Sequence, residues 1–382
     1  MKLAFILGKN YLLSIAEILA YYNAKNTKYK LLAYSKEILL LDTDLPDIDK
    51  LGGTIKVVEI KQEGPLESFD LSQLLPDIKE KAFFGISMYG KTKSKKLIKS
   101  LATKLQKEQR SEGKKYKAFL PPRGTSLTHV EVLKKGLIDS AEIIIFELKG
   151  KTYLGKTIQV HNPFEFQKRD IDRPIQRKAL NIPPRLAKIL INLTEAESGT
   201  LLDPFCGIGT ILMEAMLHGF EVYGIDNDKT ALTGCKKNLG WIQKQYGTEA
   251  KYNLINADSR KLANHLTEKI DAVATEPSFG PLLKRKPHYI QVEKTLLELK
   301  ELYEDVFAEL HKIMKPGTRI AITAPRFTIG KKYFSIDFNL LAKKTGFKII
   351  DPLPENIPHK IPLTDAEKRH IIIREIHILE NR

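Results

Sequence analysis

A short polar segment, Glu276-Pro277-Ser278-Phe279, follows an apolar run in the stretch DAVATEPSFG. Proline cannot donate a hydrogen bond to a sheet, so the simplest interpretation is the end of a strand and a tight turn. The same residues could also hold the exocyclic amine of a base. The Glu276 carboxylate and the Pro277 carbonyl can accept the amine hydrogens, which would orient the nitrogen lone pair toward an electrophile. The Phe279 ring can stack on the base.

A second candidate site lies in the stretch LLDPFCGIGT, which is followed by a helical pattern. Asp203 ends an apolar run that predicts a strand, and Gly207 and Gly209 would let the backbone approach a ligand at the N-terminus of the next helix. The acid before the glycines suits a cationic ligand, such as the ammonium and sulfonium groups of S-adenosylmethionine. We therefore predict a cofactor loop that also includes Phe205 and Thr210.

Two further acids end the next two predicted strands. Asp226, followed by Asn227, is placed to accept the hydroxyls of a ribose, and Asp258 could accept a hydrogen bond from an adenine amine. A nicotinamide dinucleotide is the alternative ligand, but its glycine fingerprint requires a third glycine where this chain has Leu212. Three acids at three successive strand ends favour S-adenosylmethionine over the dinucleotide.

The predicted order of strands and helices differs between the N-terminal and C-terminal parts of the chain. From about residue 185, strands and helices alternate, as in parallel α/β folds. The final segments FKIID and HIIIREIHIL could pair as a hairpin, whereas residues 149–157 look like a turn. The pattern predicts α+β units at 1–65 and 66–160, a charged, proline-rich linker at 161–184, and an α/β domain at 185–382.

The formal net charge of the 382 residues is +16. Residues 81–123 hold 13 Lys or Arg against two acids, which favours a polyanion, and nucleic acid above a membrane surface. Lys284, Arg285 and Lys286 could bind further phosphates, although a solvated loop explains them almost as well. The two cysteines, Cys206 and Cys235, predict a cytoplasmic protein without disulfides. The nine histidines show no metal-binding spacing, so no metal is predicted.

These motifs together resemble a known family. DAVATEPSFG is similar to the Asp/Asn-Pro-Pro-Tyr/Phe motif of amino-group N-methyltransferases. RDIDRPIQRKALNIPPRLAKILINL, joined to LLDPFCGIGTILMEA, resembles the THUMP-domain tRNA guanosine N2-methyltransferases that act at tRNA position 10. The resemblance implies a ferredoxin-like unit and a THUMP unit before a Rossmann-like, seven-stranded methyltransferase domain.

The resemblance also implies roles for individual residues. Pro183 and Pro184 would flank the methionine end of S-adenosylmethionine, and the segment from Glu276 to Phe279 would hold the target base of a tRNA. The chain departs from the motif in two places, because Glu276 replaces Asp or Asn and Ser278 replaces the second proline. A displacement of about 1 Å in a reacting group can cost on the order of 100-fold in rate.

The expected function is therefore methyl transfer from S-adenosylmethionine to a base amine of tRNA, most readily guanine N2. One alternative is a DNA methyltransferase acting on adenine N6 or cytosine N4. Another is an RNA-binding protein with a degenerate cofactor cleft, suggested by Glu276 and Ser278. A dinucleotide-dependent oxidoreductase is a third, and it would leave the basic region without a role. The sequence leaves a helper subunit open.

Overall fold

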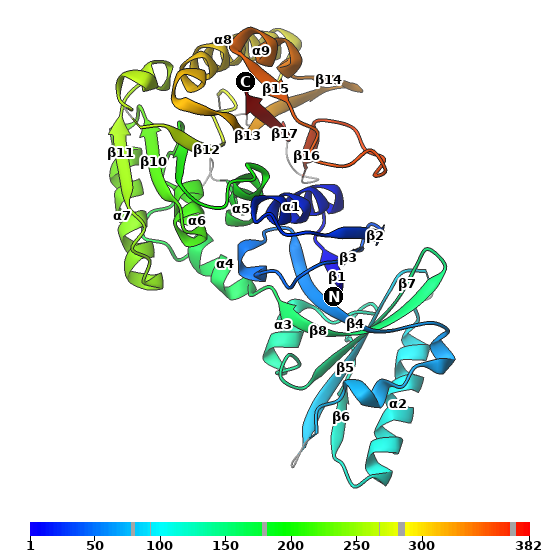
Figure 1. The fold of residues 1–382 in the computed structure, drawn as a ribbon. Helices are drawn as coiled ribbons and strands as arrows, with labels where there is room; N and C mark the ends of the chain where they lie inside the picture. Colours follow the sequence, from blue (N-terminus) through cyan, green and yellow to red (C-terminus); the bar gives the residue numbers. More distant parts are fainter. Residues whose placement is uncertain (78–80, 92, 178–181, 267, 282–286, 367–371) are drawn as a thin grey trace. The chain divides into compact units, whose positions relative to one another are not determined.

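The computed structural model describes residues 1–77, 81–91, 93–177, 182–266, 268–281, 287–366 and 372–382. Contacts divide the chain into two compact units (Figure 1). The first unit comprises Met1–Tyr11, Thr27–Asp49 and Gly53–Phe166. The second comprises Leu12–Asn26, Lys50–Gly52 and Gln167–Arg382.

The first unit is built on an eight-stranded sheet with the strand order β2-β3-β1-β4-β8-β7-β5-β6. Its strands are β1 (Lys2–Leu7), β2 (Lys30–Tyr34), β3 (Ile38–Asp42), β4 (Thr54–Glu63), β5 (Ala82–Tyr89), β6 (Tyr116–Phe119), β7 (Ala141–Leu148) and β8 (Lys151–Val160). Strand β5 pairs in parallel with β6 and β7, and the other neighbours are antiparallel. The prediction of a turn at 149–157 was wrong for most of that segment, because β8 forms a hairpin with β7 and pairs with β4 on its other side.

Two helices lie on opposite faces of this sheet, α2 (Lys95–Ser111) and α3 (His129–Lys134). Successive strand residues point to opposite faces. Phe84 of β5 accordingly packs in one core with Ile98 and Leu105 of α2, while the adjacent Phe83 packs against the core that contains Val132 of α3. The predicted apolar stripe on α2 is confirmed, and the lysines lie on its exposed side. Short 3₁₀ turns η1 (Ile48–Lys50), η2 (Leu66–Ser68) and η3 (Leu71–Leu74) connect the strands.

A buried ion pair lies inside the first unit. Lys56 of β4 and Glu142 of β7 are 1% and 0% exposed, and the ammonium contacts the carboxylate directly. Ser87 and Thr157 each donate a hydroxyl to Glu142 at 2.6 Å, so both charges are surrounded by hydrogen-bonding groups. Burial lowers the pKa of Lys56, and the adjacent carboxylate opposes that effect.

The second unit contains a sheet whose main path is β11-β10-β9-β12-β13-β17-β15. Its strands are β9 (Thr200–Asp203), β10 (Glu221–Asp226), β11 (Tyr252–Asn256), β12 (Ile270–Thr275), β13 (Met314–Ile329), β14 (Lys332–Phe334), β15 (Phe347–Ile349), β16 (Leu363–Asp365) and β17 (Ile372–Asn381). The first five strands of this path are parallel, and β17 runs antiparallel to both neighbours. The predicted alternation of strands and helices is confirmed, and so is the predicted pairing of the last two segments, here β15 and β17. Strand β14 pairs with β13, and β16 with β17.

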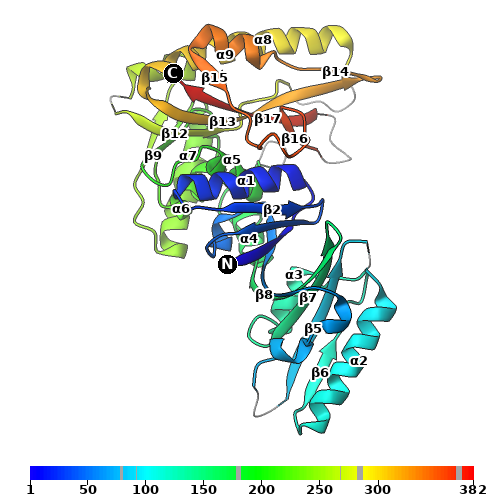
Figure 2. The ribbon, with the colours of Figure 1, turned by 45° about the vertical axis from the view of Figure 1, so that its right-hand side comes forward.

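Helices cover both faces of the second sheet (Figures 1 and 2). Helices α8 and α9 contact each other on one face, and α5, α6 and α7 lie along the other. The helices from residue 163 onward are α4 (Pro163–Asp170), which spans the boundary between the two units, and then α5 (Pro184–Leu193), α6 (Thr210–His218), α7 (Lys229–Tyr246), α8 (Tyr289–Ile313) and α9 (Phe338–Thr345), with the 3₁₀ segment η4 (Ser259–Asn264). None of the helices in the described parts of the chain is long and apolar enough to cross a membrane.

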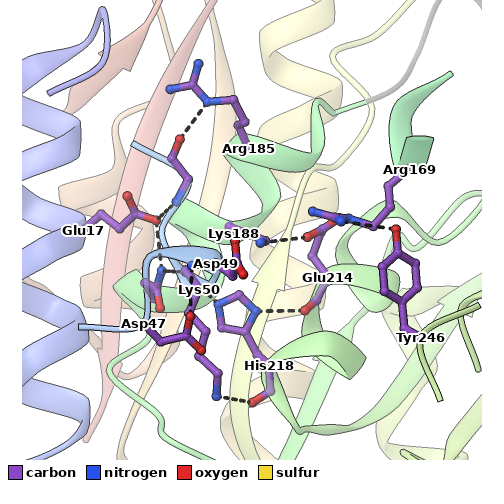
Figure 3. Close-up of polar contacts among 12 residues, drawn as sticks. Glu17, Asp47, Asp49, Lys50, Arg169, Arg185, Lys188, Glu214, His218 and Tyr246 are labelled. Atoms are coloured by element: carbon purple, nitrogen blue, oxygen red, sulfur yellow. Dashed lines mark hydrogen bonds and ion pairs between the residues drawn. The ribbon is translucent and has the colours of Figure 1, made fainter. Parts of the chain in front are cut away.

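Helix α1 (Tyr11–Ala24) is early in the sequence but belongs mostly to the second unit. The Glu17 carboxylate accepts hydrogen bonds from the Gly52 amide at 2.6 Å and from Asn192 of α5 at 2.9 Å. Arg185 of α5 donates to the Gly52 carbonyl at 2.7 Å, as Figure 3 shows. A Cβ at Gly52 would lie 2.1 Å from the Arg185 carbonyl oxygen, so only glycine fits there. These contacts attach an N-terminal helix to the unit that carries the candidate site.

Candidate active site

The ends of β9 and β12 form the centre of the candidate site. The two strands are parallel neighbours, with Leu201 opposite Ala272 and Leu202 opposite Val273. The sheet continues from β9 to β10 on one side and from β12 to β13 on the other, so this is its topological switch point, where α/β proteins bind ligands. Thr275 donates its hydroxyl to Asp203 Oδ1 at 2.6 Å, which joins the two strand ends directly.

The glycine loop after β9 has the conformation that its sequence predicts. Gly207 has φ +51° and Gly209 has φ +86°, and α6 begins at Thr210 immediately afterwards. A Cβ at Gly209 would lie 2.5 Å from Cys235 Sγ, whereas a Cβ at Gly207 would meet no atom within 4 Å. Gly209 therefore allows the loop to pack on α7, and Gly207 exposes backbone to open space beside a helix N-terminus.

A hollow lies between this loop and β12. It brings together Asp203, Phe205, Gly207 and Thr210 of the glycine loop and Glu276, which ends the neighbouring strand. The complete lining is Ile182, Asp203, Phe205, Cys206, Gly207, Ile208, Thr210, Ile211 and Glu276. Pro183 and Pro184 follow Ile182 at the start of α5, where Pro183 is exposed and Pro184 is buried.

Asp203 is a buried acid whose contacts are neutral groups. Its side chain accepts hydrogen bonds from the Thr275 hydroxyl and from the Phe205 amide, the latter at 3.1 Å, and the residue is 2% exposed. Burial raises the pKa of Asp203 to about 7, and the negative charges of Asp226 and Glu276 act in the same direction. A bound cation would stabilise the ionised form of this carboxyl group.

The other two strand-end acids already hold neighbouring groups. Asp226 accepts the Gly207 amide on Oδ2 and the Asp228 amide on Oδ1, both at 2.8 Å, and so fixes the glycine loop. Asn227 is exposed. The Asp258 carboxylate pairs with the Arg260 guanidinium at 2.6 Å, and this contact lowers the pKa of Asp258. Neither acid lines the hollow, so their proposed contacts with ribose and adenine stay predictions.

The segment after β12 forms a tight turn, as expected. The Gly280 amide donates to Ser278 Oγ at 3.2 Å, and Gly280 has φ +91°. Pro277 is buried, Phe279 is half-buried and Ser278 is exposed. The serine therefore stabilises the turn by a local hydrogen bond where the related motif has a second proline.

Glu276 makes contacts that the sequence analysis did not foresee. Arg374 of β17 donates Nε to Glu276 Oε2 at 2.7 Å and Nη2 to Oε1 at 3.1 Å. Thr323 of β13 adds a hydroxyl hydrogen bond to Oε2 at 3.1 Å. The available signal for this contact was Arg374 itself, a cation next to the apolar residues Ile372 and Ile373 of the C-terminal strand.

Arg173 is a second residue that the sequence analysis missed. It is 2% exposed, and its Nη1 donates to Thr210 Oγ1 at 2.6 Å, at the start of α6. The nearby Arg169 donates Nε to the buried Glu214 of α6, also at 2.6 Å. The segment predicted to be a linker thus contains α4 and supports the helix that follows the glycine loop.

Two further points of the sequence analysis concern phosphate-binding cations and metal ligands. Lys284, Arg285 and Lys286 lie outside the described residues. Within the described residues, no group of three or more His, Cys, Asp or Glu side chains could hold a metal ion.

The first unit offers a separate basic surface on α2. Lys96, Lys99, Lys104 and Lys107 line a shallow, open surface together with Ser100 and Thr103, and all six side chains are exposed. The basic region predicted from the sequence thus presents a row of cations on one helix face.

Comparison with protein families relates the chain to methyltransferases. Residues 172–333 match the family described as RMKL-like, methyltransferase domain, and residues 79–237 match a DNA methylase family. The tRNA (guanine(10)-N2)-dimethyltransferase of Pyrococcus abyssi is 30% identical over 228 residues, which cover 59% of this chain and 60% of that protein. The chain thus matches less than two thirds of that relative.

A shorter relative is covered more completely. The protein of Methanothermococcus thermolithotrophicus named "Probable tRNA (guanine(10)-N2)-dimethyltransferase" is 33% identical over 138 residues, which cover 34% of this chain and 82% of that protein. Among solved structures, TrmN from Thermus thermophilus superposes with a TM-score of 0.52 at 15% identity, covering 100% of this chain and 99% of that one. This likeness confirms the predicted α/β fold with a Rossmann-like domain.

Proposed function

The chain belongs to the family of the tRNA (guanine(10)-N2)-dimethyltransferases, and we propose that it transfers methyl groups from S-adenosylmethionine to guanine N2 of a tRNA. The observation that carries this proposal is the joining of two strand ends. Asp203 of the glycine loop and Glu276 of the amine-binding segment line the same hollow.

The residues of the hollow fit S-adenosylmethionine. The open space beside Gly207 and the N-terminus of α6 suit close contact with its methionine part. Asp203 is a buried carboxyl group with neutral hydrogen-bond donors, and a cationic ligand would stabilise its ionised form. When bound, the cofactor would supply an activated methyl group. We propose Asp226, Asn227 and Asp258 for its nucleoside part, and Pro183, Pro184, Phe205, Gly209 and Thr210 for the walls around it.

The amine would be oriented by the segment after β12. The Pro277 carbonyl and the Glu276 carboxylate would accept the two amine hydrogens, and Phe279 would stack on the base. Methylation of the nitrogen makes its remaining protons more acidic, and Glu276 would take one of them. This geometry requires the target nucleotide to be flipped out of its stack.

The first unit would bind tRNA outside the reacting nucleotide. We propose that residues 1–65 form a ferredoxin-like unit and residues 66–160 a THUMP unit, and that the lysines of α2 contact the phosphate backbone. The variant Lys96→Ala/Lys99→Ala should reduce the slope of log affinity against log salt by roughly 0.7–0.9 for each lysine that contacts a phosphate. The control Lys343→Ala/Lys348→Ala, on exposed lysines of the second unit, should leave the slope unchanged.

The match to a DNA methylase family makes DNA amine methylation the second candidate function. Transfer of labelled methyl groups to unmodified tRNA and to duplex DNA, followed by nucleoside mass spectrometry, separates the two. N2-methylguanosine or N2,N2-dimethylguanosine from tRNA supports the proposal, whereas methylated adenine or cytosine from DNA alone refutes it. Glu276→Gln and Asp203→Ala should each lower transfer by orders of magnitude while tRNA binding persists.

A further inference from the structure

We propose that Arg374 is the positioning residue that adapts this site to a glutamate in the amine-binding segment, an inference that rests on the proposed function. Glu276 has one more rotatable bond than an aspartate, so an unrestrained side chain would present its oxygens at many positions. An acceptor for a reacting amine must instead stay within a fraction of an ångström of one position.

Three donors from two strands fix the Glu276 carboxylate. Arg374 contacts both oxygens, at 2.7 and 3.1 Å, and Thr323 contacts Oε2 at 3.1 Å. The two side chains of the ion pair are only 13% and 12% exposed, so solvent screens this pair weakly. Two-point contact of a guanidinium with a carboxylate fixes direction as well as distance.

The sheet register explains why Arg374 can reach this acid. Strand β13 lies between β12 and β17, and Arg374 stands opposite Pro325 while Ile376 stands opposite Thr323. Ile322 of β13 pairs with Thr275, the residue before Glu276. Both donating side chains therefore belong to strands of the sheet, which are a more rigid support than a loop.

Arg374 also contacts the residue proposed to stack on the base. Its guanidinium carbon lies 5.9 Å from the centroid of the Phe279 ring, within the range of a cation–π contact. One side chain thus holds both the carboxylate acceptor and the ring. The ion pair also offsets a negative charge beside Asp203, where a second unpaired carboxylate would raise the cost of ionising that acid.

A double-mutant cycle tests this role. Arg374→Met should lower kcat for tRNA methylation by about 100-fold while the affinity for S-adenosylmethionine changes by less than about threefold. In a protein that already carries Glu276→Gln, adding Arg374→Met should lower kcat by less than about threefold, because the carboxylate that Arg374 positions is no longer present. Additive losses in the two backgrounds would overturn the proposal.

Arg326→Met is the matched control. Arg326 forms a similar partly buried pair with Glu375 on the same two strands, but the described contacts do not link it to Glu276. An equal loss of kcat in Arg326→Met and Arg374→Met would show a general effect on the sheet and overturn the proposal.

Failure of the proposed function would be visible separately. Absence of transfer by the unchanged protein to any tRNA would refute that function, and crystal structures of the unchanged protein and of Arg374→Met would then decide the inference. If the Glu276 carboxylate has moved in the Arg374→Met structure, the inference is supported. If the carboxylate stays in place, the inference is overturned.

Discussion

Cofactor binding should depend on pH through Asp203. The pKa of this buried carboxyl group is raised from 3.8 to about 7, so the group changes its charge near neutral pH. With a pKa of about 7, about 3% of the Asp203 carboxyl groups are ionised at pH 5.5 and about 76% at pH 7.5. If the cation of S-adenosylmethionine binds the ionised form, the affinity should rise about 25-fold between these values. The α-amino group of the ligand stays mainly protonated in this range, since such groups titrate near 7.7–8.0.

Isothermal titration calorimetry at pH 5.5, 6.5 and 7.5 measures this dependence. Binding below pH 7 should release a proton, which appears as a heat that varies with the ionisation enthalpy of the buffer. Asp203→Asn should bind weakly with little pH dependence. Asp258→Asn should keep the pH dependence, because the Arg260 ion pair lowers the pKa of Asp258 and its titration lies at lower pH. An affinity that is constant across this range in the unchanged protein would refute the reasoning.

The carboxyl group of Asp203 should also make the stability of the ligand-free protein depend on pH. The folded state binds the Asp203 proton more tightly than the unfolded state, so this group makes stability fall as pH rises from about 4 to about 7. The fall amounts to at most about 4 kcal/mol from this single group. Asp203→Asn should remove it, and denaturant titrations of both proteins at pH 5 and 8 measure the difference. A variant that is no more stable than the unchanged protein at pH 8 would contradict the raised pKa.

Two further substitutions test the structure. Gly209→Ala should abolish cofactor binding measured by calorimetry, because the new Cβ would meet Cys235 Sγ at 2.5 Å and the residue has φ +86°. The control is Gly240→Ala in α7, where the new Cβ would have no atom within 4 Å. This variant should bind the cofactor normally. Glu142→Ala should lower the free energy of unfolding by about 3–5 kcal/mol, since it leaves the Lys56 charge buried without its partner. The double variant Glu142→Ala/Lys56→Met should recover part of that loss in urea titrations, and no recovery would contradict an ion-pair origin.

The predictable parts of the site depend on local spacing. Asp203, Gly207 and Gly209 follow one strand and precede one helix, so their order in the sequence alone places them at the same strand end. Glu276 could be assigned to the same edge because it also ends a parallel strand. The helix α2 was predictable because its apolar and basic residues separate at helical spacing.

The missed parts depend on register and on distant partners. Arg374 lies 98 residues from Glu276 in the sequence, and only the antiparallel pairing of β17 with β13 brings the two side chains together. Strand β8 was missed because Gly155 and several polar residues resemble the sequence of a turn. Glycine occurs at position 155 for another reason, since a Cβ there would lie 2.5 Å from the Glu59 carbonyl oxygen of the neighbouring strand. The inclusion of α1 in the second unit depends on the buried Glu17, and a single acid in an apolar helix gives no indication of its partner.

The two acids of the hollow are distinguished by their surroundings. Glu276 has a guanidinium and a hydroxyl as donors, so its negative charge is compensated within the protein. Asp203 has a hydroxyl and an amide, which orient its carboxyl group without neutralising it. A cationic ligand therefore gains more at Asp203 than at Glu276, because an uncompensated buried charge attracts a counter-charge most strongly. Under the proposed function, this arrangement would direct a sulfonium donor to the end of β9 and leave the end of β12 for a neutral amine, which is the separation that methyl transfer between them requires.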